Sequence, residues 1–209
     1  MAHTVPTVPL SGRPRDPSAA MRHWYERELG WATMPGEPLR LVTGLRFDVL
    51  EVPAEAGFAA LRHLGPGSPV ALHGGRMRLL VAAGSADELP GLLDWLEWGA
   101  LALDLTATGA GGHMEAPRPP GWNPAGRPSG RSGSPGAWPL PLCRTGSQGA
   151  AVWLRPPEPR CEIELLLPTL SALGGGGGAP DLVRLVDTMA TQCHRVRLRR
   201  ACAQALAFS

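Results

Sequence analysis

Carboxylates lie inside two apolar stretches of the chain, where acids are costly to bury and often functional. Asp48 and Glu51 stand in the first stretch and Asp104 in the second. Two-metal chemistry needs acids that converge on ions about 3.5–4 Å apart, usually from positions i and i+2 of a strand. Asp48 and Glu51 are three residues apart and point to opposite faces of a strand. We expect Asp48 to form a surface ion pair with Arg46. Asp104 needs a hydrogen-bond donor or a cation.

A glycine pair between two predicted strands forms the second candidate site, in the run His73-Gly74-Gly75-Arg76-Met77-Arg78. Adjacent glycines let backbone N–H groups approach a phosphate, and Arg76 and Arg78 would supply positive charge. The same pair is typical of a tight hairpin turn, which needs no ligand. His113, which follows a further Gly-rich turn, could act as an acid, a base or a ligand, or could simply be exposed.

Arginines gather near the C-terminus, at Arg195, Arg197, Arg199 and Arg200. Apolar residues at helical spacing predict one long helix from residue 181 to about 207. Arg clusters on helices bind phosphate backbones, and they bind acidic protein surfaces equally well. We therefore expect a nucleic-acid or protein partner on this helix, and the sequence leaves both open.

The elements that must position these residues alternate between helices and short strands. Pro53 suits the first position of a helix and ends the strand that carries Glu51. The order predicts an α+β fold with one mixed sheet and flanking helices. Helices are expected at 18–29, 54–64, 85–98 and 181–207, and strands at 39–42, 47–52, 70–72, 77–81, 101–106, 113–116 and 151–154.

The composition along the chain predicts where the folded domain begins and ends. Of 209 residues, 27 are Gly and 23 are Pro, while 44% are hydrophobic and the formal net charge is only +2. A wholly disordered chain would be poorer in apolar residues and more highly charged. All the basic residues are Arg, which is typical of a GC-rich genome. The dense Gly/Pro stretches predict a flexible arm (1–17), a disordered insertion (117–149) and a Gly-rich tether (171–180). The α+β domain is then 18–170, and 181–209 is the C-terminal helix.

Several protein classes are excluded by pattern. No stretch of eighteen apolar residues is present, so no membrane-spanning helix is predicted. The N-terminus lacks the pattern of a signal peptide, and we expect a cytoplasmic protein. The four cysteines have no CxxC spacing, which favours free thiols over a zinc site.

The order of the motifs resembles the bifunctional DNA primase/polymerase N-terminal family, within the archaeo-eukaryotic primase superfamily. The resemblance covers about residues 20–157. It is carried by Tyr25, Gly30-Trp31, Thr43-Gly44, Val49-Leu50-Glu51-Val52-Pro53, His73-Gly74-Gly75-Arg76-Met77, Leu103-Asp104-Leu105 and Gly111-Gly112-His113-Met114-Glu115-Ala116-Pro117.

The resemblance implies a primase/polymerase-like fold in which two strand acids and a later Asp hold Mg²⁺ or Mn²⁺. It also implies a hairpin His that binds the nucleotide phosphate. Glu51 corresponds to the first strand acid and Asp104 to the later Asp, but Pro53 stands at the second strand acid and Met77 at the His. Losing a metal ligand leaves the charge of phosphoryl transfer unstabilised. We expect a non-catalytic, regulatory platform that binds nucleic acid or protein, with no cofactor.

Two other functions fit the same residues. An active metal-dependent nucleotidyltransferase would use Glu51, Asp104 and the two turn arginines with Mg²⁺ or Mn²⁺, and His73 or His113 would replace the missing His. A protein-interaction module would instead act through the C-terminal helix.

Overall fold

The computed structural model describes residues 17–121, 150–159, 161–170 and 180–206. All but the last residue of the predicted flexible arm (1–17) and of the Gly-rich tether (171–180), and most of the predicted disordered insertion, lie outside these ranges. None of the described helices has the length and apolarity needed to cross a membrane.

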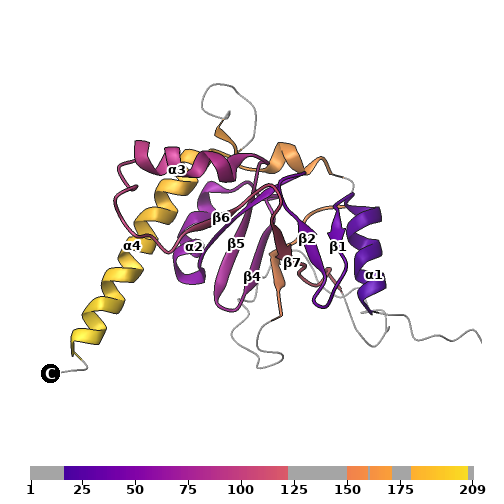
Figure 1. The fold of residues 1–209 in the computed structure, drawn as a ribbon, viewed down its shortest axis with the longest axis horizontal. Helices are drawn as coiled ribbons and strands as arrows, with labels where there is room; N and C mark the ends of the chain where they lie inside the picture. Colours follow the sequence, from indigo (N-terminus) through magenta and orange to yellow (C-terminus); the bar gives the residue numbers. More distant parts are fainter. Residues whose placement is uncertain (1–16, 122–149, 160, 171–179, 207–209) are drawn as a thin grey trace, which may run out of the picture.

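Strands and helices alternate along the described chain, as expected for an α+β protein (Figure 1). The strands are β1 (Thr33–Met34), β2 (Arg40–Val42), β3 (Asp48–Pro53), β4 (Val70–His73), β5 (Arg76–Val81), β6 (Thr106–Thr108), β7 (His113–Glu115) and β8 (Val152–Arg155). The α-helices are α1 (Pro17–His23), α2 (Ala54–Ala60), α3 (Ser85–Trp95) and α4 (Leu182–Leu206). A π-helical turn (Trp24–Glu28) continues α1, a 3₁₀ turn (Leu61–His63) continues α2, and another 3₁₀ turn spans Ile163–Leu166.

The prediction of one mixed sheet was wrong, because the described strands form two antiparallel sheets. One has the order β6-β3-β5-β4-β8 and the other the order β1-β2-β7. A helical crossover such as α2 yields a parallel pair only when the strands on either side of it become neighbours. Here β4 follows α2, but its hairpin partner β5 lies next to β3. The β3–β5 pair is therefore antiparallel.

Helices α2, α3 and α4 cover one face of the five-stranded sheet (Figure 1). Buried side chains of β3 and β5, including Leu50 and Met77, pack there against Ala56 of α2 and Leu185 of α4. The approach of α2 is close, since a Cβ added at Gly57 would lie 2.5 Å from the sulfur of Met77. This core fixes which face of the sheet is left for polar chemistry.

Helix α1 and the small sheet cover the opposite face, with a second core that is rich in aromatic residues, including Trp31 and Phe47. Tyr25 fastens it, because its hydroxyl donates to the carbonyl of Pro117 at 2.5 Å and accepts from Trp153 Nε1 at 3.0 Å. Burial raises the pKa of Tyr25, which outweighs the opposing effect of the Trp153 hydrogen bond. The phenol therefore stays neutral as a structural bridge.

The predicted strand at 101–106 was also wrong, since only Thr106–Thr108 form a strand, β6. The residues before it lie beside α4, which is a continuous helix as predicted. Arg197 Nη1 donates to the backbone carbonyl of Ala102 at 2.8 Å. The thiol of Cys193 donates to the backbone carbonyl of Asp104 at 3.5 Å. These carbonyls are therefore bound by helix side chains rather than by a neighbouring strand.

Candidate functional site

The pairing of β3 with β5 creates the polar cluster. Glu51 lies directly across from Arg78, and Pro53 lies across from Arg76. Glu51 is also the one residue of β3 that is not fully buried. Its Oε2 accepts a hydrogen bond from Arg78 Nε at 2.6 Å. Alternation along both strands therefore places one carboxylate and two guanidinium groups on the face away from α2.

Asp48 lies on the other face, as its spacing from Glu51 predicts. The expected surface ion pair with Arg46 was wrong. Asp48 is only 1% exposed, and its Oδ2 accepts from the backbone N–H of Ala86 at 2.9 Å, in the first turn of α3. Arg46 precedes β3, so strand alternation does not extend to it, and its Nε donates to Glu164 at 2.5 Å. Asp48 therefore stabilises the start of a helix.

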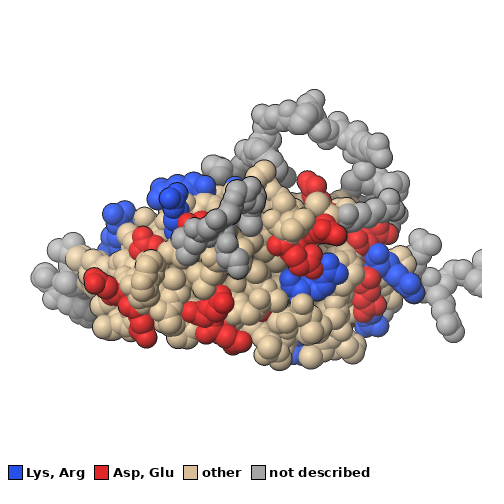
Figure 2. Space-filling view, turned by 90° about the horizontal axis from the view of Figure 1, so that it is seen from above, with Lys and Arg blue, Asp and Glu red and all other residues tan. Residues whose placement is uncertain are grey.

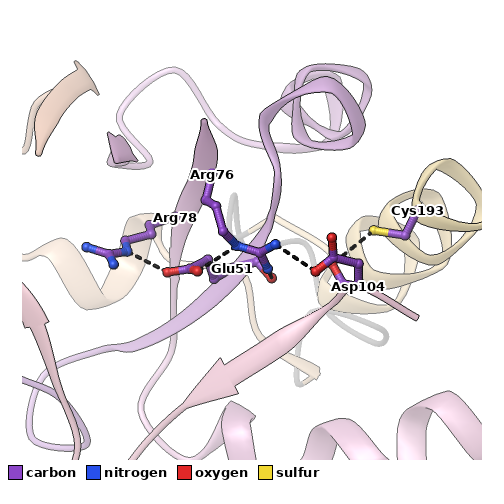
Figure 3. Close-up of polar contacts among 5 residues, drawn as sticks. All are labelled: Glu51, Arg76, Arg78, Asp104 and Cys193. Carbon is purple, nitrogen blue, oxygen red and sulfur yellow. Dashed lines mark hydrogen bonds and ion pairs between the residues drawn. The ribbon is translucent and has the colours of Figure 1, made fainter. Parts of the chain in front are cut away.

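Arg76 stands between the two acids that the resemblance assigns to metal. Its Nε donates to Glu51 Oε1 and its Nη1 to Asp104 Oδ1, each at 2.6 Å (Figure 3). Its Nη2 also reaches the backbone carbonyl of Glu51 at 3.4 Å. Both oxygens of Glu51 thus accept from guanidinium groups, since Arg78 holds the other one. The structure brings Glu51, Arg76, Arg78 and Asp104 together in one ion-pair network.

Electrostatics follows from these contacts. Burial opposes ionisation of Glu51, but the hydrogen bonds and charges of Arg78 and Arg76 outweigh it and lower the pKa of this carboxyl group. Burial likewise opposes the charge of Arg76, yet Asp104 and Glu51 raise the pKa of its guanidinium. Glu51 and Arg76 are therefore both charged at neutral pH.

Met77, at the position that the resemblance gives to a nucleotide-binding His, is fully buried in the core beneath α2. Neighbouring residues of β5 point to opposite faces, so a side chain at 77 points away from Glu51. A His there would not reach the network. His73, at the end of β4 and directly across from Arg76, is the nearer candidate.

The glycine pair forms the predicted hairpin turn between β4 and β5. Gly74 and Gly75 have φ angles of +55° and +79°, which favour glycine. A Cβ at either position would meet nothing within 4 Å, so no close approach of another group requires glycine there. The turn geometry alone accounts for the pair.

A cleft of about 400 Å³ opens between the two sheets at this network. Two polar contacts, one between His73 and Glu115 and one between Arg40 and His113, join side chains that line the cleft. His73 Nε2 lies 3.3 Å from Glu115 Oε2, and Arg40 Nη1 lies 2.9 Å from His113 Nε2. Because a guanidinium can only donate, His113 Nε2 accepts in this pair. The charged or polar lining residues are Arg40, Glu51, His73, Arg78, Thr108, His113 and Glu115.

One guanidinium nitrogen among the lining residues of the cleft makes no hydrogen bond to the described part of the chain. Arg78 Nη1 is buried and has no hydrogen-bond partner among the described residues. Leaving a charged donor unpaired in a buried position is costly, so such groups often mark ligand contacts.

No family model, curated protein or solved structure matches the chain. What the cleft can bind must therefore follow from its own residues.

The site does not fit a divalent metal ion. Such ions need free carboxylate oxygens, and Arg76 lies between Glu51 and Asp104 while Arg78 holds the remaining oxygen of Glu51. Among the described residues, no three His, Cys, Asp or Glu side chains are grouped as metal ligands. The two acids instead fix the positions of guanidinium donors.

The arginines of α4 lie apart from the cleft. Arg197 binds the Ala102 carbonyl, and Arg199 pairs with Glu55 of α2 at 2.7 Å. Arg195 and Arg200 are exposed and have no partner within the part of the chain that the structure describes. On the face shown in Figure 2, basic side chains stand in separate groups with acidic ones nearby rather than in one continuous surface.

Sequence reasoning missed Arg40 and Glu115 as site residues. They lie directly across from each other on β2 and β7, and both line the cleft. Opposite charges in two short strands were the available signal. That pairing spans 75 positions of sequence, so the residues alone did not reveal it.

Proposed function

We propose that the chain is a non-catalytic, cytoplasmic primase/polymerase-like domain whose cleft binds a phosphate-bearing ligand, a nucleotide or the backbone of a nucleic acid. The observation that carries the proposal is the guanidinium of Arg76 between Glu51 and Asp104. A positively charged side chain stands where metal-dependent transfer would need a positively charged ion.

The network supports binding over transfer. A metal ion entering between the acids would have to displace Arg76 and would then lie beside a displaced positive charge. Phosphoryl transfer relies on metal ions to neutralise the charge that develops. Guanidinium groups held by carboxylates, in contrast, are already oriented for an anion and lose little freedom on binding it.

Phosphate suits the donors of the cleft. Arg78 Nη1 is buried and unpaired, Arg40 uses one nitrogen on His113, and Thr108 adds a hydroxyl group to the lining. Guanidinium groups bind phosphate in a bidentate manner, and hydroxyl groups commonly complete such sites. The cleft volume, about 400 Å³, lies within the range of small-ligand pockets.

A thermal-shift titration without metal tests the proposal, with nucleoside triphosphates, a short single-stranded DNA and inorganic phosphate as probes. A ligand at a hundred times its Kd stabilises by about 2.7 kcal/mol, which raises Tm by about 5–10 °C in a chain of this size. We expect this shift for the wild type and for Arg195→Gln, which alters an exposed arginine of α4. Arg40→Gln and Arg78→Gln should weaken binding about tenfold or more.

Two results would contradict it. No shift with any probe at millimolar concentration would refute phosphate binding. Incorporation of nucleotides with Mg²⁺ or Mn²⁺, abolished by Asp104→Ala, would instead establish the alternative of an active nucleotidyltransferase. Circular dichroism of each variant separates lost binding from lost folding.

A protein-interaction role through α4 is the second candidate, and the exposure of Arg195 and Arg200 favours it. The first half of α4 cannot be removed to test it, because Leu182, Leu185 and Met189 are buried in the core. Reversal of charge at the exposed arginines keeps the fold. A partner captured from lysate by the wild type and equally by an Arg195→Glu/Arg200→Glu variant would exclude these contacts.

A further inference from the structure

A second pocket, of about 320 Å³, lies between α4 and the segment that leads into β6. Its main lining residues are Pro53, Asp104, Cys193, Val196, Arg197 and Arg200. It shares no lining residue with the cleft, and Arg76, which lines neither, bridges Glu51 of the cleft to Asp104 of this pocket (Figure 3). The pocket is therefore a distinct site, and it does not depend on the function proposed for the cleft.

The inner wall of this pocket is apolar and unreactive. It is formed by Pro53, by Val196 and by Cys193, which is 2% exposed. Burial, with a smaller contribution from the charge of Asp104, raises the pKa of the Cys193 thiol to about 11, and Arg76 only partly opposes this. The thiol is therefore protonated at neutral pH and contributes apolar surface.

The rim carries charges of both signs. Arg197 and Arg200 are one helical turn apart on α4, so they lie on the same side of it. Arg197 commits one nitrogen to the Ala102 carbonyl, whereas Arg200 has no partner among the described residues. Across from them, Asp104 gives one carboxylate oxygen to Arg76, and its side chain is 47% exposed.

We propose that this pocket binds a carboxylate that carries an adjacent apolar side chain and an N–H group, as in the last residue of a peptide or an N-acylated amino acid. The carboxylate contacts Arg200 and Arg197, the apolar side chain covers Pro53 and Val196, and the N–H donates to the free oxygen of Asp104. A polyanion such as nucleic acid fits less well, since Asp104 would repel it and the apolar wall would go unused.

The test is a titration of the full chain followed by amide ¹H–¹⁵N chemical shifts, with N-acetyl-leucine as the probe. We expect saturable shifts centred on residues 102–104 and 196–201. N-acetylglycine, which lacks the apolar side chain, and N-acetyl-leucinamide, which lacks the carboxylate, should each bind at least about tenfold more weakly. A tetrapeptide that ends in Leu distinguishes the two sources: tighter binding than N-acetyl-leucine indicates a chain end, and equal binding indicates a small molecule.

Two variants test the contribution of the Arg200 charge and of the pocket volume separately. Arg200→Gln removes an exposed guanidinium that the fold does not use, and it should weaken binding about tenfold. Ala201→Phe fills the pocket from an exposed position and should abolish binding. Arg195→Gln is the matched control, because it removes an exposed arginine of α4 outside the pocket, and it should change Kd less than twofold. The proposal would be overturned if the wild type showed no saturable shifts. It would also be overturned if Arg200→Gln and Ala201→Phe both bound N-acetyl-leucine with the affinity of the wild type.

Discussion

Glu51→Gln is the substitution that most directly tests the role of the network. It keeps the shape of the side chain and removes the charge that Arg76 and Arg78 share, each through a nitrogen at 2.6 Å. A glutamine oxygen can still accept from one guanidinium, but its NH₂ group would face the other as donor against donor.

The size of the loss follows from the exposure of the three side chains, which is 23% for Glu51, 29% for Arg76 and 14% for Arg78. Removing one partner of a fully buried ion pair costs about 3–5 kcal/mol. A single hydrogen bond to a charged group is worth about 1.5–3 kcal/mol. The site is partly exposed and one of its two bonds survives, so we expect the free energy of unfolding to fall by about 2–3 kcal/mol.

Urea unfolding at pH 7 measures this loss, and Glu55→Gln is the matched control. Glu55 is also a carboxylate paired with an arginine, Arg199, but these two side chains are 52% and 63% exposed. Exposed pairs contribute little, so the control should lose no more than about 0.5 kcal/mol. Both variants change the net charge by the same amount.

The pH dependence gives an internal check. Because the pKa of Glu51 is lowered in the folded protein, its contribution is complete above the ordinary Glu pKa. The contribution is lost as pH falls through the lower, folded-state value. Wild type and Glu51→Gln should therefore converge in stability in acid. Equal losses for Glu51→Gln and Glu55→Gln at pH 7 would refute the reasoning. A higher free energy of unfolding for Glu51→Gln would also refute the reasoning. Removing a charge stabilises the fold only if Glu51 and Asp104 repel each other without being paired to arginines.

Three further substitutions or reactions test the parts of the fold that hold the site. Met77→His should lower the free energy of unfolding in urea by about 2 kcal/mol or more, because an imidazole would be buried among apolar side chains, and it should not create nucleotide incorporation. Tyr25→Phe should cost about 1–3 kcal/mol in the same assay, since it leaves a buried carbonyl group and an indole N–H unpaired. Iodoacetamide at pH 8, followed by mass spectrometry, should label the exposed Cys161 and Cys202 but not Cys193 until the chain unfolds.

Local pattern was enough to predict most of the elements that hold the site. The period of two along β3 separates Asp48 from Glu51, and the structure confirms it with a helix contact on one face and guanidinium contacts on the other. The Gly74–Gly75 pair predicts a hairpin because both residues need positive φ. Such features depend on neighbours within a few residues.

The decisive contact of the site could not be predicted in that way. Arg76 meets Asp104 across 28 positions of sequence, and the intervening chain contains the whole of α3. The apolar pattern of residues 101–106 predicts a strand, yet only Thr106 of this run belongs to one. The carbonyl groups of Ala102 and Asp104 instead accept from Arg197 and Cys193, which lie about ninety positions further on. Only the packing of α4 determines that arrangement.

Charge balance connects Pro53 with the position of Arg76. The resemblance places an acid at position 53, which would lie on the same face of β3 as Glu51 and directly across from Arg76. With Pro53 there, Glu51 and Asp104 carry two negative charges, and Arg76 and Arg78 carry two positive ones. The site is neutral by itself, so a cation entering it would meet no net attraction. An anion that takes up the unpaired Arg78 Nη1, in contrast, satisfies a buried donor that the fold leaves without a partner among the described residues. Pro53, where the resemblance would place a metal ligand, and Arg76, which stands between Glu51 and Asp104, thus both favour the proposed function, a cleft that binds anions without transferring them.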